Sequence, residues 1–411
     1  MKAVRSLEVS MAGRRVGELV AAPSGGLYFA YDTQWLATGF ALSPLNMSFD
    51  AAPQTAPDAH LFAGLHGAFA DSLPDGWGML LMDRWLQREY GLDRHRITSL
   101  DRLAYIGSRA MGALEYQPSM DRDATGPLAL APLYQAALDV HEGDSGDVLG
   151  ALRLAGGSPG GARPKVVVAL SADHSHCASP FEPLPPQHAH WLVKFRSRDE
   201  HVDTGAIEFA YAQMAAAAGV QITEPALLPV ETASGGERFF ATRRFDRDGD
   251  RKRHMLTASG LLYADHRMPS LDYGDLLRAV WTITRHAGEV EHMARLMVFN
   301  ALAHNRDDHA KNFTFLFDEG RWQLAPAYDL TFSRTGGMAD EHTTAFAGAG
   351  LATRAALHKV CEPFPFLDVD LHIEQTLEAL SAWQPLCREL EITPQEVGMI
   401  ATALEGVRKA L

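Results

Sequence analysis

The sequence has few cysteines and no long apolar run. Its three cysteines, Cys177, Cys361 and Cys387, are widely spaced and odd in number, a pattern that predicts neither a disulfide framework nor a cysteine zinc site. No stretch reaches the roughly 18 to 20 apolar residues that a membrane-spanning helix needs. The basic N-terminal residues are not followed by a continuous apolar segment, so we expect no secretory signal. Together these absences favour a soluble protein of the reducing cytoplasm.

Basic residues are too few for broad contact with nucleic acid. The sequence holds 37 Lys and Arg against 51 Asp and Glu, which gives a formal net charge of −14. Binding over a wide nucleic-acid surface needs clustered Lys and Arg to neutralise phosphates. The stretches RSRDEH (196–201) and TRRFDRDGDRKRH (242–254) could form local basic patches, but solvated surface charge is the simpler interpretation of both.

Residues 1–120 are predicted to form a small α+β unit of a chain long enough for about two or three domains. Alternating apolar residues on both sides of the Ala12-Gly13 turn indicate two strands. The aromatic stretch GLYFAYDTQWLA (26–37) is also typical of a strand. WGMLLMDRWLQREYGL (77–92) has helical periodicity up to Gly91, a residue type that commonly ends helices.

The rest of the chain is predicted to form two larger lobes. Residues 121–252 alternate helical and strand patterns around a glycine-rich loop, which predicts a mixed α/β lobe. From residue 253 to 411 helical periodicity dominates, interrupted by a hairpin pattern at 312–325, so we expect an all-helical lobe apart from that hairpin. The boundary is placed in the charged stretch 248–256. The predicted fold class is therefore α+β.

The stretch HNRDDHAKNF (304–313) crowds carboxylates, imidazoles, amides and basic groups into one short segment. One interpretation is a metal-hydrolase site with His304, Asp307, Asp308 and His309 as ligands, although no HExxH-type helical pair is present. A second is a catalytic loop for phosphoryl transfer, and a third is a solvated polar turn. The stretch alone leaves all three open.

Spacing around this stretch favours phosphoryl transfer. Asp307 and Asn312 are five residues apart, and the predicted hairpin that follows would return Asp329 to their side. A protein kinase needs one Asp as catalytic base, an Asn five residues later and an Asp after a hairpin as Mg²⁺ ligands. Amide and carboxylate oxygens suit Mg²⁺ better than zinc.

Upstream segments supply the other parts that a kinase requires. GGSPGGARPK (156–165) precedes an apolar strand pattern, and glycines there would let backbone N–H groups approach phosphate closely. Lys194 lies inside the apolar strand HWLVKF, where a buried ammonium needs an anionic partner. Glu208, on the next predicted helix, can supply it. Each feature alone has a structural explanation, but their order along one chain matches that of a kinase.

At these residues the chain resembles the HipA family, the serine/threonine kinase toxins of bacterial type II toxin–antitoxin systems. The matching segments run along nearly the whole chain and are LPDGWG, YIGSRAMGALEY, SPGGARPK, the Lys194 strand, RRFDR (243–247), DDHAKNF and LAPAYDL. The resemblance implies a protein-kinase-like two-lobed fold with a small extra N-terminal subdomain.

The resemblance also assigns roles to single residues. Asp307 would be the catalytic base, and Asn312 and Asp329 would bind Mg²⁺. The remaining residues implied in ATP binding are Gly160, Gly161, Ala162, Arg163, Lys165, Lys194, Glu208, Arg243, Phe245, His309 and Tyr328. Two positions depart from the general kinase pattern, because Asn305 replaces the His of H-R-D and Leu330 follows Asp329 in place of Phe. A lid equivalent is expected near 318–319 or 336–350.

The family further implies regulation and partners. Ser158 stands where family members are autophosphorylated, and a phosphoserine would add about −1.5 to −2 charge to a site built for ATP phosphates. The implied target is a translation component such as an aminoacyl-tRNA synthetase. The implied partner is a small helix-turn-helix antitoxin, HipB-like, which would make most of the contact with operator DNA. The alternatives are a degenerate kinase that binds nucleotide and antitoxin without turnover, and a small-molecule kinase.

Overall fold

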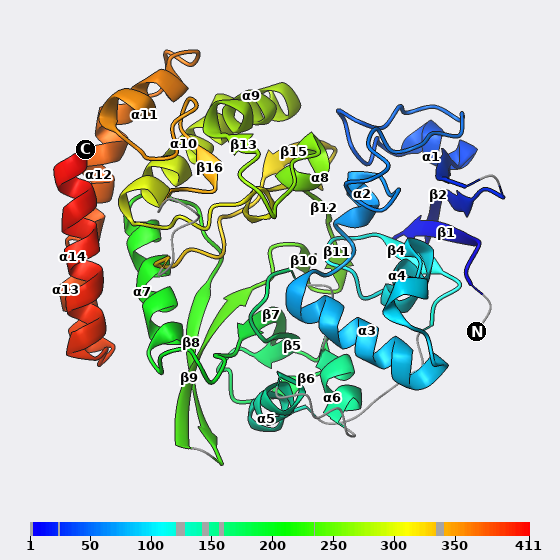
Figure 1. The fold of residues 1–411 in the computed structure, drawn as a ribbon, viewed down its shortest axis with the longest axis horizontal. Coiled ribbons are helices and arrows are strands. Elements are labelled where there is room, and N and C mark those ends of the chain that lie inside the picture. Colours follow the sequence, from blue (N-terminus) through cyan, green and yellow to red (C-terminus); the bar gives the residue numbers. More distant parts are fainter. Residues whose placement is uncertain are drawn as a thin grey trace.

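The computed structural model describes residues 3–23, 25–120, 128–141, 148–155, 160–233, 235–333 and 341–411. The chain forms three parts, each built on its own sheet (Figure 1). The N-terminal unit, coloured blue to cyan, lies at one side of the molecule, and the last helices lie at the opposite side. Over the described residues, no helix is both long and apolar enough to cross a membrane.

The N-terminal unit consists of a four-stranded antiparallel sheet of order β3-β2-β1-β4 and short helices. Its elements are β1 (Ser6–Met11), β2 (Arg14–Ala21), β3 (Leu27–Tyr31), α1 (Thr33–Thr38), α2 (Gly67–Ala70), α3 (Gly76–Tyr90), η1 (Arg94–Arg96), α4 (Ser99–Ile106) and β4 (Glu115–Gln117). The Ala12-Gly13 turn between β1 and β2 is present, and both residues have positive φ. Helix α3 ends at Gly91, whose φ of 63° is the left-handed conformation that glycine adopts readily.

The middle part is built on a five-stranded antiparallel sheet of order β6-β5-β7-β9-β8. Its elements are α5 (Leu130–His141), α6 (Val148–Ala155), β5 (Lys165–Ser171), β6 (Cys177–Ala178), β7 (His188–Lys194), α7 (Thr204–Ala217), β8 (Pro225–Thr232) and β9 (Gly235–Arg243). Every residue of β5 is buried, as the apolar run predicts. The register places Lys165, the first residue of β5, directly opposite Lys194, the last residue of β7. Two lysines therefore lie side by side at one end of the sheet.

The C-terminal part is helical and carries a small sheet of order β12-β14-β15. Its elements are β12 (His254–Thr257), α8 (Ala258–Leu262), β13 (Leu271–Asp272), α9 (Tyr273–Thr284), α10 (Ala287–Leu302), η2 (Ala310–Asn312), β14 (Thr314–Asp318), β15 (Arg321–Leu324), β16 (Thr344–Ala345), α11 (Arg354–Cys361), α12 (Val369–Leu380), α13 (Trp383–Glu389) and α14 (Pro394–Ala410). The hairpin predicted at 312–325 is β14–β15. The charged stretch at the predicted boundary forms a second short hairpin, β10 (Arg247–Asp248) with β11 (Arg251–Lys252).

The N-terminal unit packs against both other parts. Leu7 of β1 belongs to the same buried apolar cluster as Met297 of α10 in the C-terminal part. On the other side, Trp77 and Leu81 of α3 share a cluster with Val166 of β5. Burial of these apolar side chains stabilises the contacts between the parts, so the N-terminal unit is held against both the middle part and the C-terminal part.

Candidate active site

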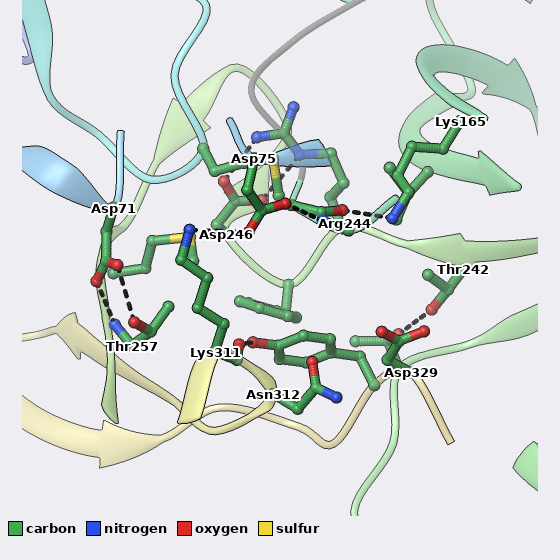
Figure 2. A pocket seen from close by; sticks show the side chains of 18 of the residues that line it. Asp71, Asp75, Lys165, Thr242, Arg244, Asp246, Thr257, Lys311, Asn312 and Asp329 are labelled. Carbon is green, nitrogen blue, oxygen red and sulfur yellow. Dashed lines mark hydrogen bonds and ion pairs between the residues drawn. The ribbon is translucent and has the colours of Figure 1, made fainter. Parts of the chain in front are cut away.

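A cavity lies where the three parts meet, and its walls come from all of them (Figure 2). The lining residues are Asp71, Leu73, Asp75 and Met111 of the N-terminal unit, Gly160, Gly161, Lys165, Leu192, Lys194, Thr223, Thr242 and Arg243 of the middle part, and Arg244, Phe245, Asp246, Met255, Thr257, His309, Lys311, Asn312, Tyr328 and Asp329. The lining is divided between charged side chains and apolar or aromatic ones; we call the part around Lys194 and Asp329 the charged end and the part around Phe245 and Tyr328 the apolar end. Such a division suits a ligand with an apolar ring and an anionic group.

Lys194 forms the centre of the charged end. Its ammonium group donates to Glu208 of α7 and to Asp329, and the side chains of Lys194 and Glu208 are 5% and 1% exposed. Burial acts to lower the pKa of Lys194, but the carboxylates of Asp329 and Glu208 raise it above its ordinary value. Burial likewise acts to raise the pKa of Asp329, but the ammonium groups of Lys194 and Lys165 hold it below its ordinary range. Lys194 is therefore charged, and Asp329 is ionised.

Arg163 and Lys165 flank this pair. Arg163 donates to Glu208 over 3.0 Å and lies 2.8 Å from Glu200. The carboxylate of Glu208 therefore forms ion pairs with both Lys194 and Arg163. Lys165 donates to the carbonyl oxygen of Gly160. Burial lowers the pKa of Lys165 to about 8, an effect that Asp329 opposes. A buried ammonium with so low a pKa would be stabilised by an anionic ligand.

The loop that carries Asp307 is held in place by its neighbours. The hydroxyl of Ser333 accepts hydrogen bonds from the backbone N–H groups of Arg306 and Asp307, over 2.8 and 3.0 Å. Asn312 donates through Nδ2 to the carbonyl oxygen of Asp307 over 2.8 Å, so its Oδ1 is the atom of this side chain suited to bind a cation. Burial raises the pKa of Asp307, an effect that His309 opposes and Asp329 reinforces. A raised pKa makes this carboxylate a better proton acceptor.

Asp308, next to Asp307, has a structural role. It is 1% exposed and accepts hydrogen bonds from the Tyr273 hydroxyl over 2.7 Å and from the backbone N–H of Thr344 over 3.1 Å. Its carboxylate also lies 3.0 Å from Nδ1 of His342. The segment around β16 is thereby fixed to the loop that carries Asp307 and Asp308, so this part of the expected lid region is anchored. Residues 336–340 of that region lie outside the described residues.

The geometry disfavours the metal-hydrolase interpretation of the same stretch. His304, one of its four proposed ligands, stacks on Phe332 with ring centroids 4.8 Å apart. Asp308, another of them, is bonded to Tyr273 and to the backbone of Thr344. Among the residues that the structure describes, no group of three or more His, Cys, Asp and Glu side chains is arranged to hold a metal ion. Asn312 and Asp329, the predicted Mg²⁺ ligands, line the same cavity.

The apolar end of the cavity is formed by aromatic and sulfur-containing side chains. The rings of Phe245 and Tyr328 lie 5.5 Å apart at 36°, and Phe245 belongs to one apolar cluster with Met111 and Met255. Both residues line the cavity together with Asn312. An adenine ring would find a flat aromatic surface here.

Behind this end, Asp246 is completely buried and forms the centre of a charged cluster. It accepts two hydrogen bonds from Arg244, over 2.9 and 2.6 Å, and a third from Arg247 over 2.7 Å. It also accepts from the backbone N–H of Gly112 in the N-terminal unit, over 2.7 Å. Both arginines hold the pKa of Asp246 below its ordinary range despite its burial. The RRFDR segment therefore joins the N-terminal unit to the middle part.

The structure brings most of the predicted site residues together. Those that line the cavity are Gly160, Gly161, Lys165, Lys194, Arg243, Phe245, His309, Asn312, Tyr328 and Asp329. Three others, Arg163, Glu208 and Asp307, contact or influence these residues without lining it, and Ala162 is exposed. The roles assigned to all of them stay predictions. Ser158 lies outside the described residues.

Sequence reasoning missed eight polar residues that also line the cavity, which are Asp71, Asp75, Thr223, Thr242, Arg244, Asp246, Thr257 and Lys311. Asp71 accepts from the backbone N–H and hydroxyl of Thr257, over 2.6 and 2.8 Å. Asp75 accepts from Lys311 over 2.9 Å. The LPDGWG and DDHAKNF segments that contain Asp75 and Lys311 were noted as motifs, but no sequence signal links them to each other.

The fold and the cavity define a two-lobed α+β protein with a charged cleft and an additional N-terminal unit beside it. Residues 7–117 match the model of the HipA N-terminal domain, and residues 157–402 match the model of the HipA-like C-terminal domain. The chain belongs to the HipA family.

Individual relatives agree with this assignment. The chain is 28% identical over 358 residues to "Putative kinase Y4mE" of Sinorhizobium fredii, a match that covers 80% of this chain and 77% of that protein. It is 30% identical over 151 residues to "Putative kinase Y4dM" of the same organism, where the match covers 34% of this chain and 36% of the relative. Among solved structures, it has the fold of HipA from Shewanella oneidensis MR-1, solved in complex with HipB and its operator DNA. That similarity has a TM-score of 0.70 at 16% identity and covers 98% of this chain and 95% of the other.

Proposed function

We propose that the protein is an ATP- and Mg²⁺-dependent serine/threonine protein kinase. One observation carries the proposal: Lys165, Lys194, Asn312 and Asp329 line a single cavity, and burial, reinforced by the charge of Asp329, raises the pKa of Asp307. Phosphoryl transfer between ATP and a hydroxyl needs cations around the phosphates, oxygen ligands for Mg²⁺ and a base near the acceptor. The naming of two relatives as kinases supports the same activity.

Each group has a role that follows from its surroundings. Lys194, fixed by Glu208, and Lys165 would bind phosphate oxygens, while Asn312 and Asp329 would hold Mg²⁺, which neutralises charge on the transferred group. Asp307 would orient the acceptor hydroxyl and accept its proton, which its raised pKa favours. The adenine ring would lie against the aromatic surface of Phe245 and Tyr328, with the backbone of Arg243 beside it.

We further propose that the kinase is the toxin of a toxin–antitoxin pair. Membership of the HipA family supports this, and the Shewanella HipA was solved with HipB and operator DNA. The partner would be a helix-turn-helix antitoxin that contacts most of the DNA, in line with the net charge of −14 on this chain. The substrate would be a translation component such as an aminoacyl-tRNA synthetase, and Ser158 would be an autophosphorylation site.

Mass spectrometry of the purified protein incubated with Mg-ATP tests the proposal. We expect a gain of about 80 Da, the mass of one phosphoryl group, on Ser158. The matched control is Asp307→Asn, which keeps the size of the side chain but not its basicity and should show no gain. A phosphoproteome comparison of cells expressing either form would then identify the protein substrate. Absence of phosphate on Ser158 and on every test protein would contradict the kinase assignment.

A further inference from the structure

The first residues of helix α3 contact the described end of the glycine-rich loop. The backbone N–H of Trp77 donates to the carbonyl oxygen of Gly161 over 3.1 Å, and its indole N–H donates to the carbonyl oxygen of Lys165 over 3.2 Å. Gly76 has a φ of 38°, and a Cβ atom there would lie 2.6 Å from the carbonyl oxygen of Gly161. Only glycine allows so close an approach. Residues 75–77 therefore form the contact surface against which the described end of the loop packs, and we call this surface the seat.

Asp75 connects this seat to the catalytic loop. It precedes α3 at the N-cap position, yet its side chain makes no capping hydrogen bond to that helix. Its carboxylate instead accepts from the backbone N–H of Gly161 and, over 2.9 Å, from the ammonium group of Lys311. Figure 2 shows Lys311 extending toward Asp75 from the side of the cavity where Asn312 lies. One carboxylate thus joins the glycine-rich loop to the loop of Asp307 and Asn312.

Lys311 needs this partner because other carboxylates are near. Its side chain is 16% exposed, and a largely buried ammonium is stabilised by a carboxylate. Asp71 is the other carboxylate on which the charge of Lys311 acts: burial raises the pKa of Asp71, and Lys311 opposes that effect. If Asp75 lost its charge, the ammonium group of Lys311 would be attracted to Asp71, and the link between the two loops would be lost. Asp71, bonded to Thr257, makes a second link between the N-terminal unit and the C-terminal lobe.

We propose that Asp75 is a positioning residue for nucleotide binding: it seats the glycine-rich loop on the N-terminal unit and, through Lys311, ties it to the loop that carries Asp307 and Asn312. This gives the N-terminal unit a direct part in forming the phosphate end of the cavity. The inference rests on the proposed function for the identity of the ligand. Its test requires nucleotide binding but no phosphoryl transfer, so the two proposals can fail separately.

The variant that tests it is Asp75→Asn, which has the same shape and can still accept from Gly161 but no longer carries the charge that pairs with Lys311. Isothermal titration with the Mg²⁺ complex of a non-hydrolysable ATP analogue should show binding weakened about tenfold or more, as expected for loss of a charge-assisted contact. The matched control is Asp93→Asn, at another N-cap of the same unit, where the carboxylate accepts from the His95 backbone. The control should bind like the wild type.

A double variant separates positioning from general damage. In a Lys311→Met background the Asp75→Asn change should weaken binding by less than about twofold, because the partner is already gone. Hydrogen exchange at 160–165 should be faster in Asp75→Asn than in wild type, at an unchanged melting temperature. Three results would each overturn the proposal: an unchanged nucleotide affinity in Asp75→Asn, the same loss of affinity from Asp75→Asn in the wild-type and Lys311→Met backgrounds, or tighter nucleotide binding in Asp75→Asn. Tighter binding would show that the carboxylate competes with phosphate.

The same measurements distinguish the proposals. If the wild type binds the analogue but transfers no phosphate, the kinase assignment fails, and the affinity comparison still decides the role of Asp75. If the wild type binds no nucleotide, exchange at 160–165 decides whether Asp75 seats the loop.

Discussion

Replacing Glu208 with Gln tests whether the buried ion pairs of the cleft organise it. Glu208 is 1% exposed and accepts from Lys194 and, over 3.0 Å, from Arg163. At that distance and an effective dielectric constant near 20, a pair of unit charges attracts by about 5 kcal/mol before desolvation is subtracted. Breaking a buried pair from one side typically costs about 3 to 5 kcal/mol, because the remaining charge stays buried. Gln keeps the shape of the side chain but can accept from only one of the two cations at its oxygen.

We therefore expect Glu208→Gln to lower the free energy of unfolding by about 3 to 5 kcal/mol. Lys194 would then be drawn entirely to Asp329, away from the phosphates, and phosphoryl transfer should slow by about 100-fold, as for a misplaced catalytic contact. Denaturant unfolding and steady-state kinetics with varied ATP measure the two effects. Glu231→Gln, on an exposed position of β8, is the control. Wild-type stability together with wild-type turnover in Glu208→Gln would refute the reasoning.

Two further predictions concern other charged groups of the site. In the folded protein, burial lowers the pKa of Lys165 from its ordinary value of 10.5 to about 8. Between about pH 8 and 10.5 the unfolded chain therefore binds more protons than the folded protein, so the free energy of unfolding should rise with pH over that range. Because phosphate needs the charged form, the Kd for Mg-ATP should increase by at most about tenfold per pH unit above 8, and Lys165→Arg should abolish this dependence in titration calorimetry. Asp246→Asn should cost about 3 to 5 kcal/mol in denaturant unfolding, because Arg244 and Arg247 would lose their shared partner. A loss below about 1 kcal/mol would show that the cluster contributes little.

Local patterns predicted the elements that position the site. Gly91 marked a helix end because glycine adopts the left-handed conformation that stops a helix. The hairpin at 312–325 was recognisable from two apolar runs separated by Asp-Glu-Gly. The buried strand β5 followed from its continuous β-branched run. These features depend on neighbours in sequence, so the sequence alone was sufficient.

The contact between Lys194 and Glu208 was predicted for a different reason. A lysine inside an apolar strand must find an anion, and the next helix offered one glutamate on its buried face. The structure confirms this contact and adds one that was not foreseen, since Arg163 shares the same carboxylate. The order of the kinase motifs supplied the expectation that Asp329 would lie near Asp307.

Other parts of the site depend on contacts between distant segments. Asp75 and Lys311 are 236 positions apart, and Asp71 and Thr257 are 186 positions apart, so no local periodicity relates them. Asp308 was an open candidate as a metal ligand because its sequence neighbours are polar. Only its burial against Tyr273 shows that it anchors the loop. Tertiary packing, not residue type, decides such roles.

The charges of the cleft suggest an order in which its cations meet a phosphate. Lys194, Arg163 and Lys311 each contact a carboxylate of the protein, and a ligand must compete with that carboxylate for them. Lys165 donates instead to a carbonyl oxygen, and burial holds its pKa near 8. A phosphate would relieve this penalty without displacing a protein anion. Lys165 is therefore the cation with most to gain from phosphate, which is why the pH dependence of nucleotide binding should follow this residue.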